Sequence, residues 1–255
     1  MVMNNATINH LSSEEIKVVL RAADEIIARG GRTLLAKILK GSREKKVLEL
    51  ELDKCPVYGA FRSETLEEIT KKIDWMIDYD FLAIEYSGKL PMIVFTDRGW
   101  QIEADQRADE FLIEWEQWLD EGKIDPEMSY LKDRNREMIL LFLDKIKESG
   151  NKQFIPYLEL WEKIDYKKVR AEIRSTIKIL ESDEIIEQQS MNTRVESINK
   201  ALEGLAPQDF LLKCWECGDR FTFTVEEQKL YRQKGFVHPK RCKSCRRKKR
   251  YEDYF

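Results

Sequence analysis

Two Cys-x-x-Cys pairs place the strongest constraint on how this chain can fold. Cys214 and Cys217 form the first pair, Cys242 and Cys245 form the second, and 24 residues lie between them. A two-residue spacer lets both sulfurs of a pair face one ion, and Gly218 permits a tight turn after the first pair. Four thiolates at about 2.3 Å suit a tetrahedral zinc ion and leave no open coordination position. The spacing therefore predicts a structural Zn²⁺ site.

Two other interpretations of these cysteines stay open. They could be unpaired buried residues, or they could form a redox Cys-x-x-Cys, which normally occurs singly at a strand-to-helix turn. The fifth cysteine, Cys55, is isolated and is expected to be a small core or loop residue. Residues 207–255 are too few to bury an adequate core alone, so zinc should supply much of their folding free energy.

The segment over 207–255 is expected to be a zinc ribbon with a basic tail. Strands are predicted over 210–213 and 220–224, on either side of the first cysteine pair. Thr224 and Glu227 have the spacing of a capping box, which predicts that a helix follows the second strand.

A family resemblance supports this interpretation. Residues 214–236 (CWECGDRFTFTVEEQKLYRQKGF) and 239–246 (PKRCKSCR) resemble bacterial zinc ribbons of the trcl type, over about 40 residues. The resemblance implies metal binding and little more.

Charge is distributed unevenly along the chain. The net charge is −3, but residues 206–255 hold 13 Lys and Arg against 7 Asp and Glu, a net of +6, and residues 1–205 carry −9. This asymmetry indicates a local anionic partner, with a solvated tail as the alternative. No apolar run approaches the roughly 20 residues that a membrane helix needs, and the start lacks a signal-peptide pattern. We therefore expect a cytoplasmic protein, with nucleoid association as an option and no membrane partner.

The fold class expected is mainly α with small β elements. Residues 1–122 are expected to form a winged helix-turn-helix, because several periodic helices precede a β-hairpin in this segment. Five helices are expected in this segment. The first begins at Ser12 or Ser13 and ends at Gly30–Gly31, and the second runs over 33–40. The third runs from a cap at Ser42 through 52, the fourth runs from a cap at Ser63 to Asp80, and the fifth starts at Asp97. The expected hairpin strands are 81–86 and 91–96.

Three stretches of this segment carry a sharper resemblance. Residues 31–47 (GRTLLAKILKGSREKKV), 57–63 (VYGAFRS) and 77–102 (IDYDFLAIEYSGKLPMIVFTDRGWQI) are similar to the RQC domain of RecQ helicases. The elements occur in the same order and at compatible spacing. The best overall similarity is to the stand-alone bacterial proteins called RQC-minor DNA-binding proteins, so the resemblance implies a bacterial DNA-binding protein.

The residues themselves give a physical basis for DNA binding. Seven cations and one anion, Glu44, lie between Arg29 and Lys46. The Lys40-Gly41-Ser42 run places a cation and a glycine at an expected helix start, where free backbone N–H groups can receive a phosphate. A solvated cationic face is the alternative.

The resemblance adds roles for particular positions. It implies that Lys40, Ser42 and Arg62 lie along the DNA backbone, and that the hairpin tip from Tyr86 to Leu90 presses on the last base pair of a duplex. The helix over 63–80 is acidic, so it is a poor candidate for the major groove, and sequence specificity should be weak. The DNA-contacting set predicted is Arg32, Lys37, Lys40, Ser42, Arg43, Lys45, Lys46, Arg62, Tyr86, Lys89, Leu90, Arg246, Arg247, Lys248, Lys249 and Arg250.

Residues 123–206 are expected to be a helical connector or interaction region. Apolar stripes over 131–148, 165–182 and 193–205 predict three helices, punctuated by Gly150–Asn151 and Pro156. No catalytic chemistry is evident there.

The sequence as a whole favours a non-catalytic binder of duplex ends, forks or junctions, with RNA as a possible second ligand. No G-x-x-x-x-G-K-[ST] run occurs, so no helicase motor is expected. Only two histidines are present, and no Ser-His or Cys-His arrangement is apparent. The alternative is a zinc-stabilised adaptor whose middle region binds a protein partner, and a nuclease is a distant third.

Overall fold

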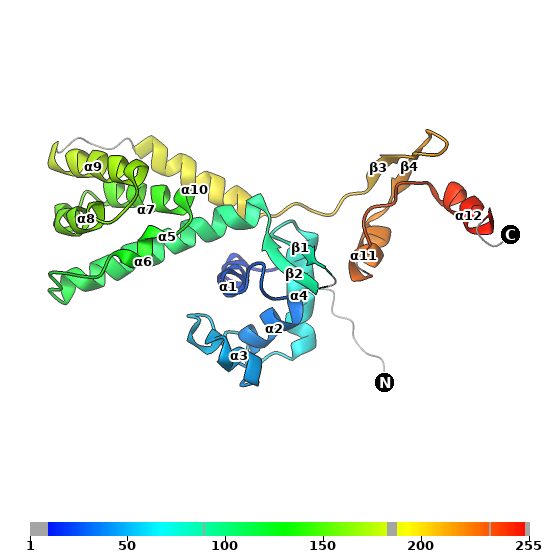
Figure 1. The fold of residues 1–255 in the computed structure, drawn as a ribbon, viewed down its shortest axis with the longest axis horizontal. Helices are drawn as coiled ribbons and strands as arrows, with labels where there is room; N and C mark the ends of the chain where they lie inside the picture. The colour runs from blue at the N-terminus through cyan, green and yellow to red at the C-terminus, as the bar shows by residue number, and fades with distance from the viewer. Residues whose placement is uncertain (1–9, 89, 183–187, 235, 253–255) are drawn as a thin grey trace.

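The computed structural model describes residues 10–88, 90–182, 188–234 and 236–252, and the side chains among these except 188–190, 232–233 and 249–252. The winged-helix elements form the middle of the molecule (Figure 1). In chain order they are α1 (Ser13–Asp24), α2 (Arg32–Lys40), α3 (Lys45–Glu49), η1 (Leu52–Lys54), α4 (Leu66–Asp78), β1 (Leu82–Ser87) and β2 (Leu90–Phe95).

Within the described residues, five further α-helices and one 3-10 turn lie between the long helix α5 (Asp97–Asp120) and the C-terminal elements. They are α6 (Ser129–Lys132), α7 (Arg136–Ser149), η2 (Lys152–Phe154), α8 (Ile155–Glu162), α9 (Lys167–Ser182) and α10 (Gln188–Leu202). The C-terminal elements are β3 (Phe210–Lys213), β4 (Arg220–Phe223), α11 (Val225–Gln233) and α12 (Lys243–Glu252). The fold is thus mainly helical with two small antiparallel sheets, as predicted.

The wing is the antiparallel pair β1–β2, and its prediction is confirmed. Its register runs from Leu82 opposite Phe95 to Ser87 opposite Leu90. Helix α1 ends at Asp24, not at Gly30 as expected, because the backbone beyond it pairs with the wing. Ala28 N–H donates to the Ile93 carbonyl at 3.0 Å, and Ile93 N–H donates to the Gly30 carbonyl at 2.8 Å.

The first turn of α5 packs on the base of the wing. Thr96 caps α5, and its Oγ1 donates to the carbonyls of Asp80 (2.6 Å) and Phe81 (3.0 Å). A Cβ added at Gly99 would lie 1.9 Å from the Phe81 carbonyl oxygen. This contact therefore requires a glycine at position 99.

Helix α5 also joins two hydrophobic cores. Its Ile102 belongs to the first core, with α1, α2, α4, the wing and two residues of α10, Ala201 and Leu202. Its Phe111 and Trp115 belong to the second core, with α7, α8 and α9. The expected boundaries after residues 122 and 206 stay predictions. The change from one core to the other occurs within α5, and α10 returns to the first core.

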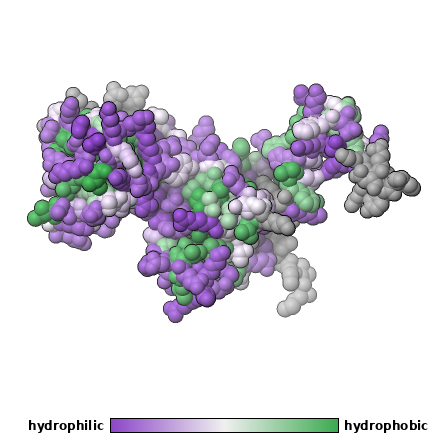
Figure 2. Space-filling view, viewed as in Figure 1, coloured by the Kyte–Doolittle hydropathy of each residue, from purple (hydrophilic) through white to green (hydrophobic). Residues whose placement is uncertain are grey.

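The helix boundaries of the middle region differ from those expected. A turn over 133–135 separates α6 from α7, and the Asn135 side chain caps α7 by accepting from Glu137 N–H at 2.8 Å. Pro156 was expected to lie between two predicted helices, but it lies in the first turn of α8. Proline is favoured there because its missing N–H has no partner to lose. Hydrophilic side chains cover most of the face in Figure 2, and every helix within the described residues is too short or too polar to cross a bilayer.

Helix α4 begins with a capping box at Thr65, not at Ser63 as predicted. Glu68 N–H donates to Thr65 Oγ1 at 3.2 Å, and Thr65 N–H donates to the Glu68 carboxylate at 2.7 Å. Within the described residues the Ser63 hydroxyl makes no hydrogen bond.

We predict that Thr65→Ala lowers the free energy of unfolding by about 1 kcal/mol. The reason is that the variant removes the hydroxyl that accepts from Glu68 N–H and so disrupts the capping box at the helix start. Ser63→Ala, two residues away and equally exposed, should change it by only a few tenths. Urea unfolding followed by circular dichroism measures both variants. Equal losses would contradict the assignment of the cap.

Candidate nucleic-acid interface and metal centre

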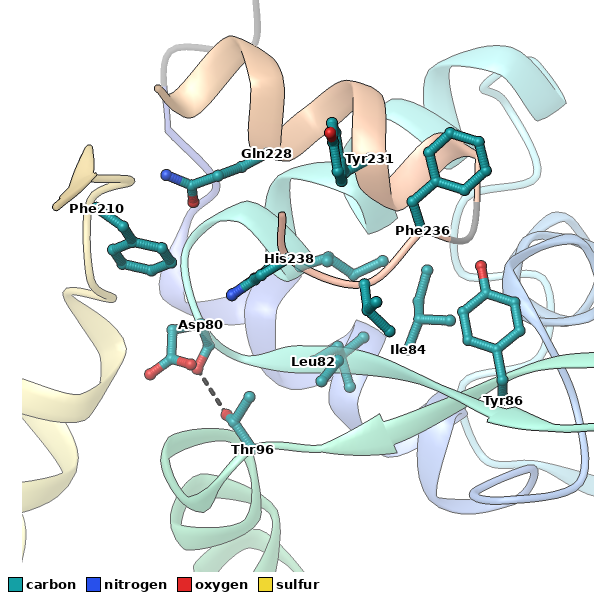
Figure 3. A pocket seen from close by; sticks show the side chains of 13 residues that line it. Asp80, Leu82, Ile84, Tyr86, Thr96, Phe210, Gln228, Tyr231, Phe236 and His238 are labelled. Carbon is teal, nitrogen blue, oxygen red and sulfur yellow. Dashed lines mark hydrogen bonds between the residues drawn. The ribbon is translucent and has the colours of Figure 1, made fainter. Parts of the chain in front are cut away.

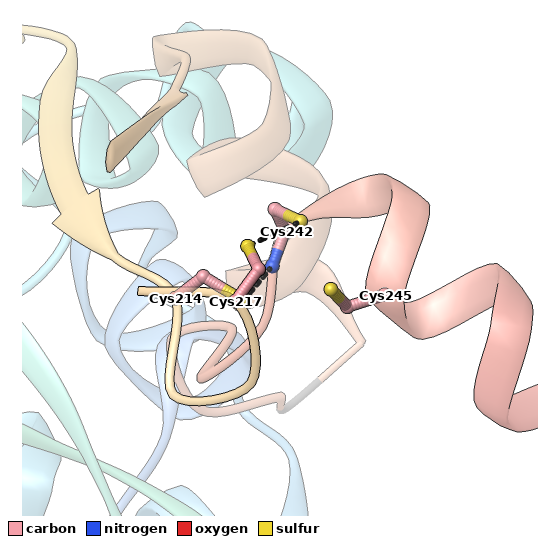
Figure 4. A group of neighbouring side chains, drawn as sticks. All are labelled: Cys214, Cys217, Cys242 and Cys245. Carbon is pink, nitrogen blue, oxygen red and sulfur yellow. Dashed lines mark hydrogen bonds between the residues drawn. The ribbon is translucent and has the colours of Figure 1, made fainter. Parts of the chain in front are cut away.

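The four paired cysteines converge on one point. Their Sγ atoms all lie within 4.8 Å of one another (Figure 4), and those of Cys217 and Cys242 are 3.9 Å apart. A tetrahedron with zinc–sulfur bonds of about 2.3 Å has sulfur–sulfur edges of about 3.8 Å. The thiols present therefore fit a four-coordinate zinc ion.

Local backbone structure brings the two pairs together. The first pair lies in the loop between β3 and β4, where Gly218 adopts a φ of +78°. The second pair lies at the start of α12, and Cys242 N–H donates to Cys214 Sγ at 3.3 Å. The carbonyl of Lys240 accepts from Trp215 N–H at 3.0 Å, which ties the two knuckles to each other.

The electrostatics of the cluster favour a cation. Backbone N–H groups, that of Cys217 first, lower the pKa of Cys214 to about 6. The pKa of Cys245 is raised, first by its hydrogen bond with Cys242 and then by burial. Thiols this close hold shared protons instead of four negative charges, and a divalent cation can replace those protons.

A second candidate site is formed by two loops of the winged-helix domain. Gly41 ends α2 with a φ of +75°, and a Cβ added at Gly41 would lie 3.1 Å from the Cα of Gly59. Gly59 N–H donates to the Ile38 carbonyl at 2.9 Å, and the Tyr58 hydroxyl donates to the Ser42 carbonyl at 3.0 Å. The loop that contains Ser42 therefore lies beside the loop that leads to Arg62.

Several of the predicted DNA-contacting cations have partners inside the protein. Lys40 Nζ donates to the carbonyls of Arg62 (2.7 Å) and Glu64 (2.6 Å), so it fixes the second loop. Arg32 pairs with Asp74 at 2.5 Å, and Lys37 pairs with Glu44 at 2.5 Å. Lys45 has only a long contact with Glu49, 3.5 Å, on an exposed surface.

Other cations of this set remain available to a ligand. Arg43 and Lys46 are exposed and form no ion pair within the described residues. Arg62 is also exposed, and its Nε donates to the Gly59 carbonyl at 3.2 Å. These side chains, not Lys40, are the stronger candidates for phosphate contacts.

The expected helix start at Ser42 is wrong. Helix α3 begins at Lys45, its N-cap is Glu44, and it has five residues. The Ser42 hydroxyl instead accepts from Glu44 N–H at 3.3 Å. The N-cap residue Glu44 brings a negative charge next to this short helix, so the helix start adds nothing to the DNA-binding hypothesis.

The tip of the wing is exposed to solvent. Tyr86 is 48% exposed and Leu90 is 63% exposed, although both are large and at least partly apolar. Gly88, with a φ of +63°, makes the turn. The predicted contact Lys89 lies outside the described residues.

One face of the wing forms a cleft of about 600 Å³ with the C-terminal elements. Figure 3 shows Tyr86 and Ile84 of β1 projecting towards the segment that carries Phe236 and His238. An ion pair between Lys229 of α11 and Asp78 of α4, 2.9 Å, lies across the same two parts of the molecule. Tyr86, at one end of the tip, lines this cleft, whereas Leu90 does not.

Helix α4 is acidic, and its unsuitability for the major groove stays a prediction from its charges. Glu67 and Glu68 are exposed, and Lys72 is held by Glu64 and Glu15 at 2.6 Å each. Helix α4 holds four carboxylates against two lysines, so phosphates would meet a net negative charge on this helix.

The basic C-terminal residues form helix α12 instead of an extended tail. Arg246 is partly buried, its guanidinium donates to the Tyr231 hydroxyl, and its carbon Cζ lies 5.9 Å from that ring. Arg247 and Lys248 are exposed. The side chains of Lys249 and Arg250 lie outside the described part of the chain.

Two side chains near these sites were absent from the prediction. Tyr58 holds the Ser42 loop, and Trp215, between the first two cysteines, is 73% exposed. The exposure of Trp215 could have been predicted from its position between the two cysteines of the first pair. When both flanking cysteines turn inward to a metal, a residue between them is directed outward.

We predict that the purified chain binds one zinc ion and that removal by a strong chelator unfolds residues 207–255 while the first core persists. The reason is that the small C-terminal segment depends on the metal for its stability. Cys242→Ser should abolish stoichiometric zinc binding, whereas Cys55→Ser, which alters a buried thiol of the first core, should not. Elemental analysis and amide hydrogen exchange provide the measurements. Full zinc content in Cys242→Ser would contradict the site.

Comparisons with known proteins identify two domains in this chain. The family described as RQC domain matches residues 12–111, and the family described as "Probable treble clef domain" matches residues 208–253. The ATP-dependent DNA helicase RecQ of Bacillus subtilis (strain 168) is 30% identical over 90 residues, which are 35% of this chain and 15% of that helicase. No solved structure matches the chain. Residues 12–111 are therefore an RQC winged-helix domain, and residues 208–253 are a treble clef zinc domain whose structural Zn²⁺ ligands are the four paired cysteines.

Proposed function

We propose that this protein is a non-catalytic DNA-binding protein that recognises duplex ends, forks or junctions through backbone contacts and the β1–β2 wing. The observation that carries the proposal is the exposed wing tip, with Tyr86 and Leu90, on an RQC domain. A tip with solvent-exposed apolar side chains suits the flat end of a base-pair stack better than a groove lined by phosphates.

Cations near the wing domain supply the backbone contacts in this proposal. Arg43, Lys46 and Arg62 are exposed, and the first two have no ion-pair partner within the described residues. Arg247 and Lys248 of α12 add positive charge at the C-terminal end. Contacts of this kind orient a protein on nucleic acid without reading its sequence, so the specificity proposed is for structure.

The match to a RecQ helicase raises the question of whether this chain is also an enzyme. The RecQ helicase is named as ATP-dependent, but this chain covers only 15% of its length and contains no P-loop sequence. A role that uses DNA binding alone, in the cytoplasm and associated with the nucleoid, is therefore proposed. RNA remains a competing ligand to be tested alongside DNA.

A second candidate function is that of a protein-interaction adaptor. Its support is a set of exposed apolar side chains on the middle region, where Ile124 is 87% exposed and Tyr166 is 58% exposed. Binding of a protein partner would remove these apolar side chains from water.

A binding panel of single strand, duplex closed by hairpins at both ends, open duplex, fork and four-way junction tests the first function. We predict tighter binding to open duplex or branched DNA than to the closed duplex. Absence of any complex below micromolar protein at low salt would remove DNA binding and leave the adaptor.

Charge reversal tests the proposed phosphate contacts. Arg43→Glu with Lys46→Glu should weaken duplex binding and make the slope of log K against log salt less steep by about 2, because two phosphate contacts are lost. Lys167→Glu with Lys168→Glu changes the net charge equally on an exposed part of α9 and is the control. Equal effects of the two double variants would indicate a general charge effect and overturn the assignment.

A further inference from the structure

The outer face of the β3–β4 hairpin carries an unfavourable arrangement of charge. Lys213 and Arg220 lie directly opposite each other in the register, next to the pair Leu211–Thr222. All four residues are exposed, since this face points away from the inner pair Phe210–Phe223. Directly opposed side chains have Cβ atoms about 4.5–5.5 Å apart, and like charges at this distance destabilise a sheet.

No acidic side chain within the described residues forms an ion pair with Lys213 or Arg220. Asp219 adjoins Arg220 in sequence without pairing with it, and Glu216 is engaged by Arg241 at 2.7 Å. A bound anion between the two cations would remove their repulsion. This is the arrangement expected of a phosphate contact.

An exposed aromatic residue lies close to the cation pair in sequence. Trp215 follows Lys213 by two residues, and 73% of its surface is accessible. Its backbone is fixed by the hydrogen bond to Lys240, and the Lys240 ammonium lies 4.6 Å from the ring centroid. A large ring held in place and flanked by cations is the composition of a stacking platform for nucleic-acid bases.

We infer that this face of the treble clef is a separate binding site for single-stranded DNA. A phosphate lies between Lys213 and Arg220, and a neighbouring unpaired base stacks on Trp215. The site is distinct from the wing, so it does not depend on the proposed duplex contacts. If both sites operate, a fork satisfies them together, since a fork presents a duplex and a single strand on one molecule.

The test uses the zinc-loaded full chain and fluorescence anisotropy of a labelled oligo(dT), with oligo(U) and the closed duplex as parallel ligands. Trp215→Ala should weaken oligo(dT) binding about 5- to 150-fold, while Trp215→Phe, which retains a stacking ring, keeps most of the affinity. Lys213→Gln with Arg220→Gln should make the salt slope less steep by about 0.7, because one single-strand phosphate contact is lost. Lys167→Gln with Lys168→Gln changes the net charge of the protein by the same amount and is the control.

Each outcome decides for or against the site. Selective loss of single-strand binding with unchanged binding to closed duplex supports it, whether or not Arg43 and Lys46 matter for duplex. Equal loss on both ligands assigns this face to the duplex interface and overturns the inference, as does oligo(U) binding tighter than oligo(dT). Zinc content is measured for every variant. If Trp215→Ala loses zinc, the strand variants Lys213→Gln and Arg220→Gln decide the question.

Discussion

The wing keeps its position because the first turn of α5 packs directly on the backbone at the base of the hairpin. Gly99 provides the close approach to Phe81, and Thr96 uses one hydroxyl both to cap α5 and to hold the carbonyls of Asp80 and Phe81. Since α5 continues into the second core, the direction of the wing is tied to the helical region as well as to the winged helix. A wing tip with this support can present apolar side chains to a ligand without collapsing onto its own domain.

Local patterns in the sequence were sufficient for the parts of the structure that depend on short-range interactions. Alternation of side chains around Gly88 predicted the hairpin, and cysteine spacing predicted the metal ligands. The cap of α4 was predictable too, because Thr65 and Glu68 have capping-box spacing whereas Ser63 lacks a Glu or Gln three residues later. The RQC resemblance, which rested on stretches within residues 31–102, agrees with the family match over residues 12–111.

Interactions between distant residues were not accessible in this way. Counting charges between Arg29 and Lys46 gave an apparently uncompensated patch, but Asp74 pairs with Arg32 from 42 residues away. Lys40 was expected at the ligand and instead holds two carbonyls across the loops. Similarly, the periodicity of the sequence indicates α5 and α10 as two individual helices but gives no contact between them. In the structure both helices contribute side chains to the first core. A charge count describes composition, and tertiary structure determines which charges are neutralised.

The RQC domain and the treble clef give the protein two chemically different surfaces. The wing domain offers an apolar tip with cations nearby, and the treble clef offers a zinc-supported hairpin with cations and an exposed indole. The central claim is that the wing tip meets the end of a duplex, and site-specific photocrosslinking tests it most directly. A benzoylphenylalanine at Leu90 should crosslink to the terminal base pairs of an open duplex, and one at Ile113, equally apolar and 52% exposed on α5, should not. Crosslinks from position 90 spread along the duplex interior, or no more frequent than those from position 113, would contradict the account.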